Sequence, residues 1–171
     1  MNIKESNLFY GGDMPAVTKT GAEKCFYWVT TRLVRESGPW YVSSEGICSP
    51  QNVYRMMQEH FDLENCDREH FICLYLDRKG HVNAANVVSV GGLSSSIVHA
   101  REVFKVAILG SAASVILVHN HPSGDPTPSR EDIDITRRMK EAGDLLGIEV
   151  LDHVIVGATG CYASLTEMGL M

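Results

Sequence analysis

Short apolar runs and helically spaced apolar positions alternate along most of the chain. Apolar or β-branched runs that end in turn residues predict strands, and these cover residues 25–35, 69–77, 81–90, 114–119, 148–156 and 161–165. Apolar positions that recur every three or four residues predict helices, and these cover residues 49–61, 99–110 and 127–146. Because the two kinds of element interleave and two strands form a hairpin, we expect an α/β sandwich around a mixed β-sheet.

The beginning of the chain shows neither pattern. Gly11, Gly12, Pro15 and Gly21 interrupt it, so we expect a loosely held arm before the strand over 25–35. The length of 171 residues is that of one domain with a substantial hydrophobic core.

Composition and charge narrow the classes of function. The net charge of −6 argues against a protein that coats nucleic acid, although a local basic patch would escape this measure. No apolar run approaches the ~20 residues that a membrane-spanning helix needs, and the N-terminus lacks a signal-peptide core. The five cysteines include no Cys-x-x-Cys pair, which fits a reducing compartment. We therefore expect a cytoplasmic protein without a membrane segment, in which Cys161 is a buried small residue.

The strand over 114–119 leads into a candidate metal site. His119 and His121 follow a buried apolar run, and residues i and i+2 of an extended segment point to the same side. Imidazole suits zinc, and a carboxylate commonly completes a three-ligand catalytic site whose fourth position holds water. Asp132 is the nearest candidate, because a proline-rich loop could fold the first turn of the next helix back toward the histidines.

Several polar residues around this site also have structural explanations. Ser129 and Asp132 satisfy the capping pattern Ser-x-x-Asp, whereas a catalytic Ser129 would donate a hydrogen bond to an oxyanion. Asp125 could approach a metal but is better explained as a turn former. Asn120 points away from its histidine neighbours, which favours a structural hydrogen bond. His153 and Asp152 are interpreted as interior residues or as neighbours of a ligand rather than as ligands.

The spacing of these residues resembles that of a known family. His-x-His, seven residues, Ser, two residues and Asp, met at His119, His121, Ser129 and Asp132, is similar to the signature of the JAMM (MPN+) metalloproteases. His-Asn-His-Pro-Ser-Gly-Asp-Pro resembles the RadC branch, as do residues 69–77, 100–107 and 142–157. The resemblance implies a RadC-like JAB/MPN domain over 41–171, with the arm and first strand over 1–40. It also implies a three-layer sandwich of the cytidine-deaminase-like kind.

The resemblance also implies roles for individual residues. His119, His121 and Asp132 would hold one Zn²⁺ per chain, and Ser129 would stabilise the oxyanion. The family takes its general base from a glutamate on an upstream strand, where Glu69 is the best match and Glu102 the competitor. The implied activity is that of a zinc metallopeptidase: hydrolysis of a peptide or isopeptide bond in a protein substrate whose identity the sequence does not give.

Two other functions compete with hydrolysis of an amide. RadC proteins are labelled as DNA repair proteins, so the chain could be a repair-associated binding module with little or no catalysis. The net charge weakens that hypothesis, as does the lack of a helix-hairpin-helix pattern near the N-terminus. A metal-dependent nuclease commonly uses paired metals, and we find no second carboxylate cluster. Zinc deaminases need a Pro-Cys-x-x-Cys motif that is absent, which excludes deamination.

Overall fold

The computed structural model describes residues 46–47, 49–91, 98–158 and 160–171. The predicted arm, the strand over 25–35 and the boundary near residue 40 lie outside the described residues. The elements within them are α1 (Pro50–Phe61), a short 3₁₀ helix η1 (Leu63–Asn65), β1 (His70–Leu76), β2 (Val82–Val90), α2 (Ala100–Leu109), β3 (Ser114–Asn120), α3 (Arg130–Leu146), β4 (Glu149–Val156) and β5 (Tyr162–Ser164). Each of these α-helices and strands was predicted, with ends that agree to within three residues, whereas the short helix η1 was not predicted.

The strands form one mixed sheet in the order β2-β1-β3-β4-β5. β3 and β4 are parallel, while the other neighbouring pairs are antiparallel. The parallel pair is joined by α3, as parallel strands require a crossover connection. The expected mixed α/β architecture is therefore confirmed.

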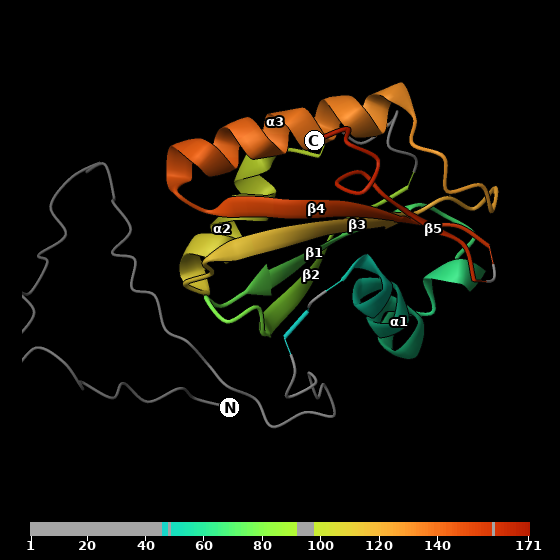
Figure 1. Ribbon diagram of the computed structural model, residues 1–171, viewed down its shortest axis with the longest axis horizontal. Helices are drawn as coiled ribbons and strands as arrows, with labels where there is room; N and C mark the ends of the chain where they lie inside the picture. The colour runs from blue at the N-terminus through green and yellow to red at the C-terminus, as the bar shows by residue number, and fades with distance from the viewer. Residues whose placement is uncertain (1–45, 48, 92–97, 159) are drawn as a thin grey trace, which may run out of the picture. The chain divides into compact units, whose positions relative to one another are not determined.

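Both faces of the sheet are covered by helices (Figure 1). On one face, Phe71, Cys73 and Tyr75 of β1 pack in a core with residues of α2 and α3. On the other, the alternate residues Ile72 and Leu74 pack with residues of α1. Burial on both faces explains why β1 is a continuous apolar run without alternation. None of the helices in the described ranges is long and apolar enough to cross a membrane.

The antiparallel pairing of β1 with β3 brings two distant segments together. Phe71 pairs with His119, and each step along β1 matches one step back along β3. Continued beyond β1, this register places Glu69 opposite His121. Because alternate residues share a face, Glu69, Phe71, His119 and His121 all belong to the face that α3 covers. The start of β1 and the end of β3 therefore form one edge of the candidate site.

Candidate metal centre

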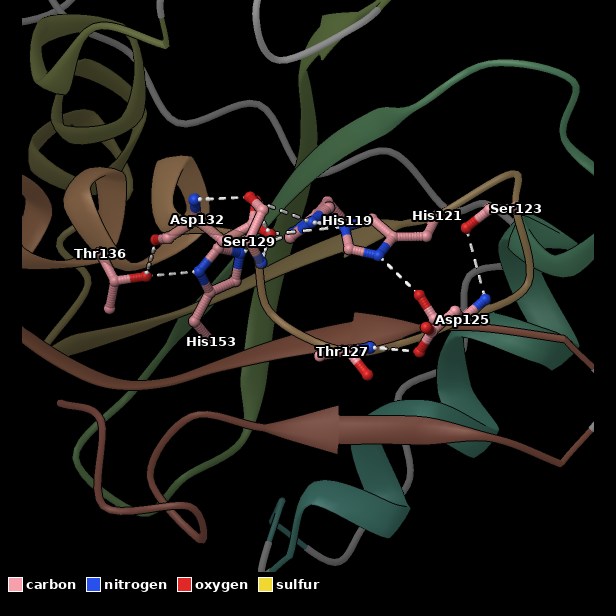
Figure 2. A network of polar contacts seen from close by, with 9 residues as sticks. All are labelled: His119, His121, Ser123, Asp125, Thr127, Ser129, Asp132, Thr136 and His153. Atoms are coloured by element: carbon pink, nitrogen blue, oxygen red, sulfur yellow. Dashed lines mark hydrogen bonds and ion pairs between the residues drawn. The ribbon is translucent and has the colours of Figure 1, made fainter.

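Three predicted ligands converge where β3 ends and α3 begins. The ligand atoms of His119, His121 and Asp132 all lie within 4.8 Å of one another. Nε2 of His119 lies 3.1 Å from Oδ1 of Asp132, and Nε2 of His121 lies 3.4 Å from Oδ2. The two Nε2 atoms are 3.0 Å apart, and Figure 2 shows the imidazole and carboxylate groups turned toward one another. His119 and Asp132 are fully buried, so the three groups form a compact site closed on its inner side.

The connection from β3 to α3 is held to the end of β4 by backbone hydrogen bonds. The N–H of His121 donates to the carbonyl of Val156, and that of Ala158 donates to the carbonyl of Gly124. Gly157 permits this close approach, because a Cβ there would lie 2.6 Å from the Gly124 carbonyl oxygen. The loop is thereby fixed on the strand that lies beside β3, and this brings α3 back over the histidines.

The start of α3 orients the Asp132 carboxylate. Ser129 is the N-cap, and the reciprocal bonds of a capping box are both present, which confirms the structural interpretation of the pair. Oδ2 of Asp132 accepts from the Ser129 N–H and the Ser129 hydroxyl, both at 2.7 Å. Oδ1 is buried and accepts no hydrogen bond from any described residue. One carboxylate oxygen is thus tied to the cap, and the other faces the histidines.

A buried chain of hydrogen bonds fixes the protonated nitrogen of His119. The Thr136 hydroxyl lies 2.6 Å from the Asp132 carbonyl oxygen and gives it its single proton. Nδ1 of His153, 2.6 Å from the same hydroxyl, must therefore donate to it. Burial lowers the pKa of His153 well below its usual value, so the ring is neutral and its Nε2 carries a lone pair. That Nε2 lies 2.8 Å from Nδ1 of His119, which consequently holds the proton and leaves a lone pair on its own Nε2.

His121 presents the same nitrogen in the same state. Its Nδ1 lies 2.7 Å from the carbonyl oxygen of Asp125, which can only accept, so Nδ1 holds the proton and Nε2 carries a lone pair. Two imidazole lone pairs and a carboxylate therefore face one another at 3.0 to 3.4 Å. This arrangement is repulsive unless a cation lies among the groups. A donor set of two imidazoles and one carboxylate fits zinc, with a further position left for water.

A proton can serve as that cation when no metal is bound. The Asp132 carboxylate raises the pKa of His121 above 6.5, because it accepts a hydrogen bond from the protonated ring and opposes its charge. Burial alone would raise the pKa of Asp132, yet its close contacts with the His119 and His121 rings and the hydrogen bond from Ser129 hold it well below its usual range. The carboxylate is therefore ionised and available to a cation at any ordinary pH.

The stability of the metal-free protein is expected to fall as the pH rises above 6.5, the ordinary pKa of His121. A group whose pKa is raised on folding stabilises the folded state fully below its unfolded-state pKa, and this contribution is lost as the pH rises through the folded-state value. Urea titrations of chelator-treated protein across this window measure the decline. Added zinc should remove this decline in the free energy of unfolding, because the ion takes the place of the proton. The His121→Gln variant should not show the decline. An unchanged decline in His121→Gln would assign it to another group.

A pocket of about 510 Å³ opens beside the three residues. Its lining residues are Glu69, His121, Pro122, Ser123, Ser129, Glu131 and Asp132. Of the two glutamates considered as a general base, only Glu69 lines it. Glu102 lies in the first turn of α2, where its carboxylate pairs with Lys105 at 2.7 Å, and the two partners Lys105 and Arg101 hold its pKa below its usual value. The register between β1 and β3 thus brings Glu69, and not Glu102, to the proposed site.

Comparison with known proteins gives the family of this chain. The profile of the family described as "RadC-like JAB domain" matches residues 47–170. The chain belongs to this family. A protein of Syntrophomonas wolfei named "UPF0758 protein" is 58% identical over 127 residues, which are 73% of this chain and 54% of that protein. Proteins of the same name from Methanosarcina acetivorans and Desulforamulus reducens are 54% and 56% identical, over 73% and 71% of this chain and 53% and 52% of their own lengths. The chain thus spans about half the length of the curated relatives that it matches.

Other polar residues of this RadC-like JAB domain support the site from outside. The Asn120 side chain accepts from the His70 N–H at 2.7 Å and donates to the Arg68 carbonyl at 3.1 Å, which confirms the structural interpretation. These bonds hold both neighbours of Glu69 against the end of β3. Asp125 forms its turn by accepting from the Thr127 N–H at 2.9 Å, also as expected.

Two features of the JAB domain were missed in its sequence, and one prediction was wrong. Thr136 was not singled out, although a threonine one turn after Asp132 on the same helix was a usable signal. The contact between His153 and His119 had no local signal, because it joins two strands. The prediction that Cys161 is buried is wrong: it is exposed in the turn before β5. Cys161 lies in the connection from β4 to the edge strand β5, outside both hydrophobic cores.

Proposed function

We propose that this domain is a zinc-dependent hydrolase of the JAMM type that cleaves a peptide or isopeptide bond. One observation carries the proposal: two imidazole lone pairs and a buried carboxylate oxygen converge beside a pocket that also contains Glu69 and Ser129. Helices on both faces of the sheet support the finer fold assignment, a three-layer sandwich of the cytidine-deaminase-like kind.

Different residues of the chain have separate roles in the proposed hydrolysis. His119, His121 and Asp132 would hold the ion. When bound, zinc lowers the pKa of a water ligand from ~16 to ~7 and polarises the substrate carbonyl. Glu69 accepts the proton that the attacking water loses and delivers it to the nitrogen of the leaving amine. Its place in the pocket beside His121 supports this role.

Ser129 is proposed to stabilise the oxyanion that forms when the carbonyl is attacked. Its hydroxyl lines the pocket but gives its proton to Oδ2 of Asp132 in this structure. With an ion held by Asp132 this bond would be weaker, and the Ser129 hydroxyl would donate its proton to a substrate oxygen instead. The bond to Oδ2 and the bond to the oxyanion would therefore belong to different states of one side chain, while the cap bond that Ser129 accepts from the Asp132 N–H is compatible with both.

Removing the Ser129 hydroxyl is expected to slow turnover ~10²- to ~10³-fold while zinc is retained, because one oxyanion donor is lost. Two substitutions separate this effect from capping. Alanine at an N-cap costs about 0.5–2 kcal/mol of stability, whereas glycine costs only a few tenths. Ser129→Ala and Ser129→Gly should therefore differ in free energy of unfolding but share the same loss of kcat. If the loss of kcat followed stability instead, the hydroxyl would act only as a cap.

The test of the proposed function is metal content followed by hydrolysis. Elemental analysis of protein purified without chelator, and again after reconstitution, should give about one zinc per chain, as a single three-ligand site requires. The loaded protein should then cleave members of a panel of peptide and isopeptide substrates, and chelator treatment should stop it. Failure to take up zinc even after reconstitution would contradict the proposal.

The described residues offer no observation that favours the alternative of a repair-associated nucleic-acid-binding module or of a nuclease. Glu69, Glu131 and Asp132 line the pocket, and their charges oppose a phosphate backbone. A gel shift that persisted at ~200 mM salt would restore the alternative, because binding by charge alone fades at that concentration. The cytoplasmic location stays an expectation.

A further inference from the structure

A closed ring of polar contacts extends from the proposed ligands into the interior of the domain (Figure 2). It runs from the Asp132 carbonyl to the Thr136 hydroxyl at 2.6 Å and from there to Nδ1 of His153 at 2.6 Å. Nε2 of His153 continues to Nδ1 of His119 at 2.8 Å, and Nε2 of His119 returns to the Asp132 carboxylate at 3.1 Å. The ring thus joins β3, β4 and α3, and two of its four members are proposed ligands.

The ring lies in the interior of the domain. Its four residues are at most 1% exposed, and Phe71 stacks on His119 and meets His153 edge-on. Polar groups buried in such surroundings cost stability unless each is paired. Both nitrogens of His153 are paired, one with a proposed ligand and the other with the threonine that binds the backbone of the second ligand. His153 therefore links the two proposed ligands by hydrogen bonds, in addition to packing in the core.

A β-bulge turns His153 toward this ring. Val150 pairs with Val115, but the next pair is Asp152 with Ile116, so Leu151 is an extra residue in β4. The extra residue reverses the alternation of faces. Val150 and His153 consequently point to the face that α3 covers, whereas Asp152 points to the other face and binds Ser164. Without the bulge, His153 would face away from His119.

We propose that Thr136 and His153 are positioning residues that fix the tautomer of His119 and so direct its Nε2 lone pair at the metal. The proposal rests on the metal site of the proposed function. Each step follows from the one before it: the Thr136 proton is taken by a carbonyl, so His153 donates through Nδ1 and accepts through Nε2. His119 must then be protonated at Nδ1. Partners of this kind behind a metal-binding histidine typically change metal affinity 10- to 100-fold when they are removed.

Thr136→Val is the sharpest test, because it removes no atom that contacts His119. Without the hydroxyl, Nδ1 of His153 loses its acceptor, and the ring can move its proton to Nε2 and donate to His119. His119 then carries its proton on Nε2, where the metal should bind. We expect zinc affinity to fall about 10- to 100-fold, measured by competition of Zn²⁺ with a chromophoric chelator.

Two further variants serve as controls. Thr136→Ser keeps the hydroxyl and should keep the affinity of the parent. Met139→Ala removes a buried side chain from the same helix and core without touching the ring, so it should lower the melting temperature but leave zinc affinity unchanged. Nitrogen-15 NMR of the imidazoles in metal-free protein at alkaline pH gives an independent readout. It should find the His119 proton on Nδ1 in the parent and both controls, and on Nε2 in Thr136→Val.

The outcomes separate this inference from the proposed function. Parent-like zinc affinity in Thr136→Val, with the His119 proton still on Nδ1, would overturn the positioning role and leave the metal site in place. A parent that takes up no zinc would overturn the metal site instead, and the NMR of the metal-free variants would still decide whether Thr136 sets the tautomer.

Discussion

Asp132→Asn is expected to weaken zinc binding so strongly that the purified protein carries almost no zinc. The substitution keeps the shape of the side chain and removes the charge that faces Nε2 of His119 and His121. Losing one partner of a buried ionic group typically costs about 3–5 kcal/mol, or roughly 10²- to 10⁴-fold in affinity. Elemental analysis of the purified variant should find almost no zinc, and chelator competition should place its affinity in that reduced range.

Asp134→Asn is the matched control for this variant. Asp134 lies on the same helix, but its side chain is half exposed and pairs with Arg137 at the surface. The control should bind zinc as the parent does, because an exposed pair of this kind contributes little. Circular dichroism should show both variants folded. An Asp132→Asn protein that still held zinc at the occupancy of the parent would show that the ligand assignment is wrong.

Glu69→Gln is expected to lower kcat ~10²- to ~10⁴-fold, the usual contribution of a general base. Zinc content should not change, because Glu69 lines the pocket but is not one of the three converging residues. The acidic limb of the pH–rate profile should disappear as well, since that limb reports protonation of the base. Steady-state kinetics of the zinc-loaded variant over a range of pH measures both effects.

Glu102→Gln provides the comparison. Glu102 pairs with Lys105 and Arg101 at the surface of α2, outside the pocket lining. Its substitution should leave kcat and the pH profile unchanged. If Glu102→Gln abolished activity while Glu69→Gln retained it, the role of base would pass to Glu102 and the register argument would fail.

Local patterns in the sequence determined much of this domain. The apolar run of β1 and the helical spacing of α3 predicted those elements to within three residues, because burial and periodicity are properties of neighbouring residues. Ser129 and Asp132 predicted the start of α3 for the same reason, because an N-cap residue forms hydrogen bonds with the first turn of its own helix. His119 and His121 could be placed on one side of a strand end from their spacing alone.

Contacts between strands could not be read in this way. The placement of Glu69 beside His121 depends on the register of β1 against β3, which joins residues about fifty positions apart. The role of His153 depends on a bulge at Leu151 that reverses the faces of β4; simple alternation would have turned that histidine away.

The sequence by itself therefore determined which residues could bind a metal and which elements carry them, because each of those signals lies within one element and its turn. The resemblance already favoured Glu69 over Glu102. Only the tertiary structure showed that Glu69 lines the pocket, which nitrogen of each histidine faces the site, and that Thr136 and His153 lie behind His119. These features arise from strand register, a bulge and the return of α3 over the sheet. They are set by the packing of the whole core rather than by any segment of it.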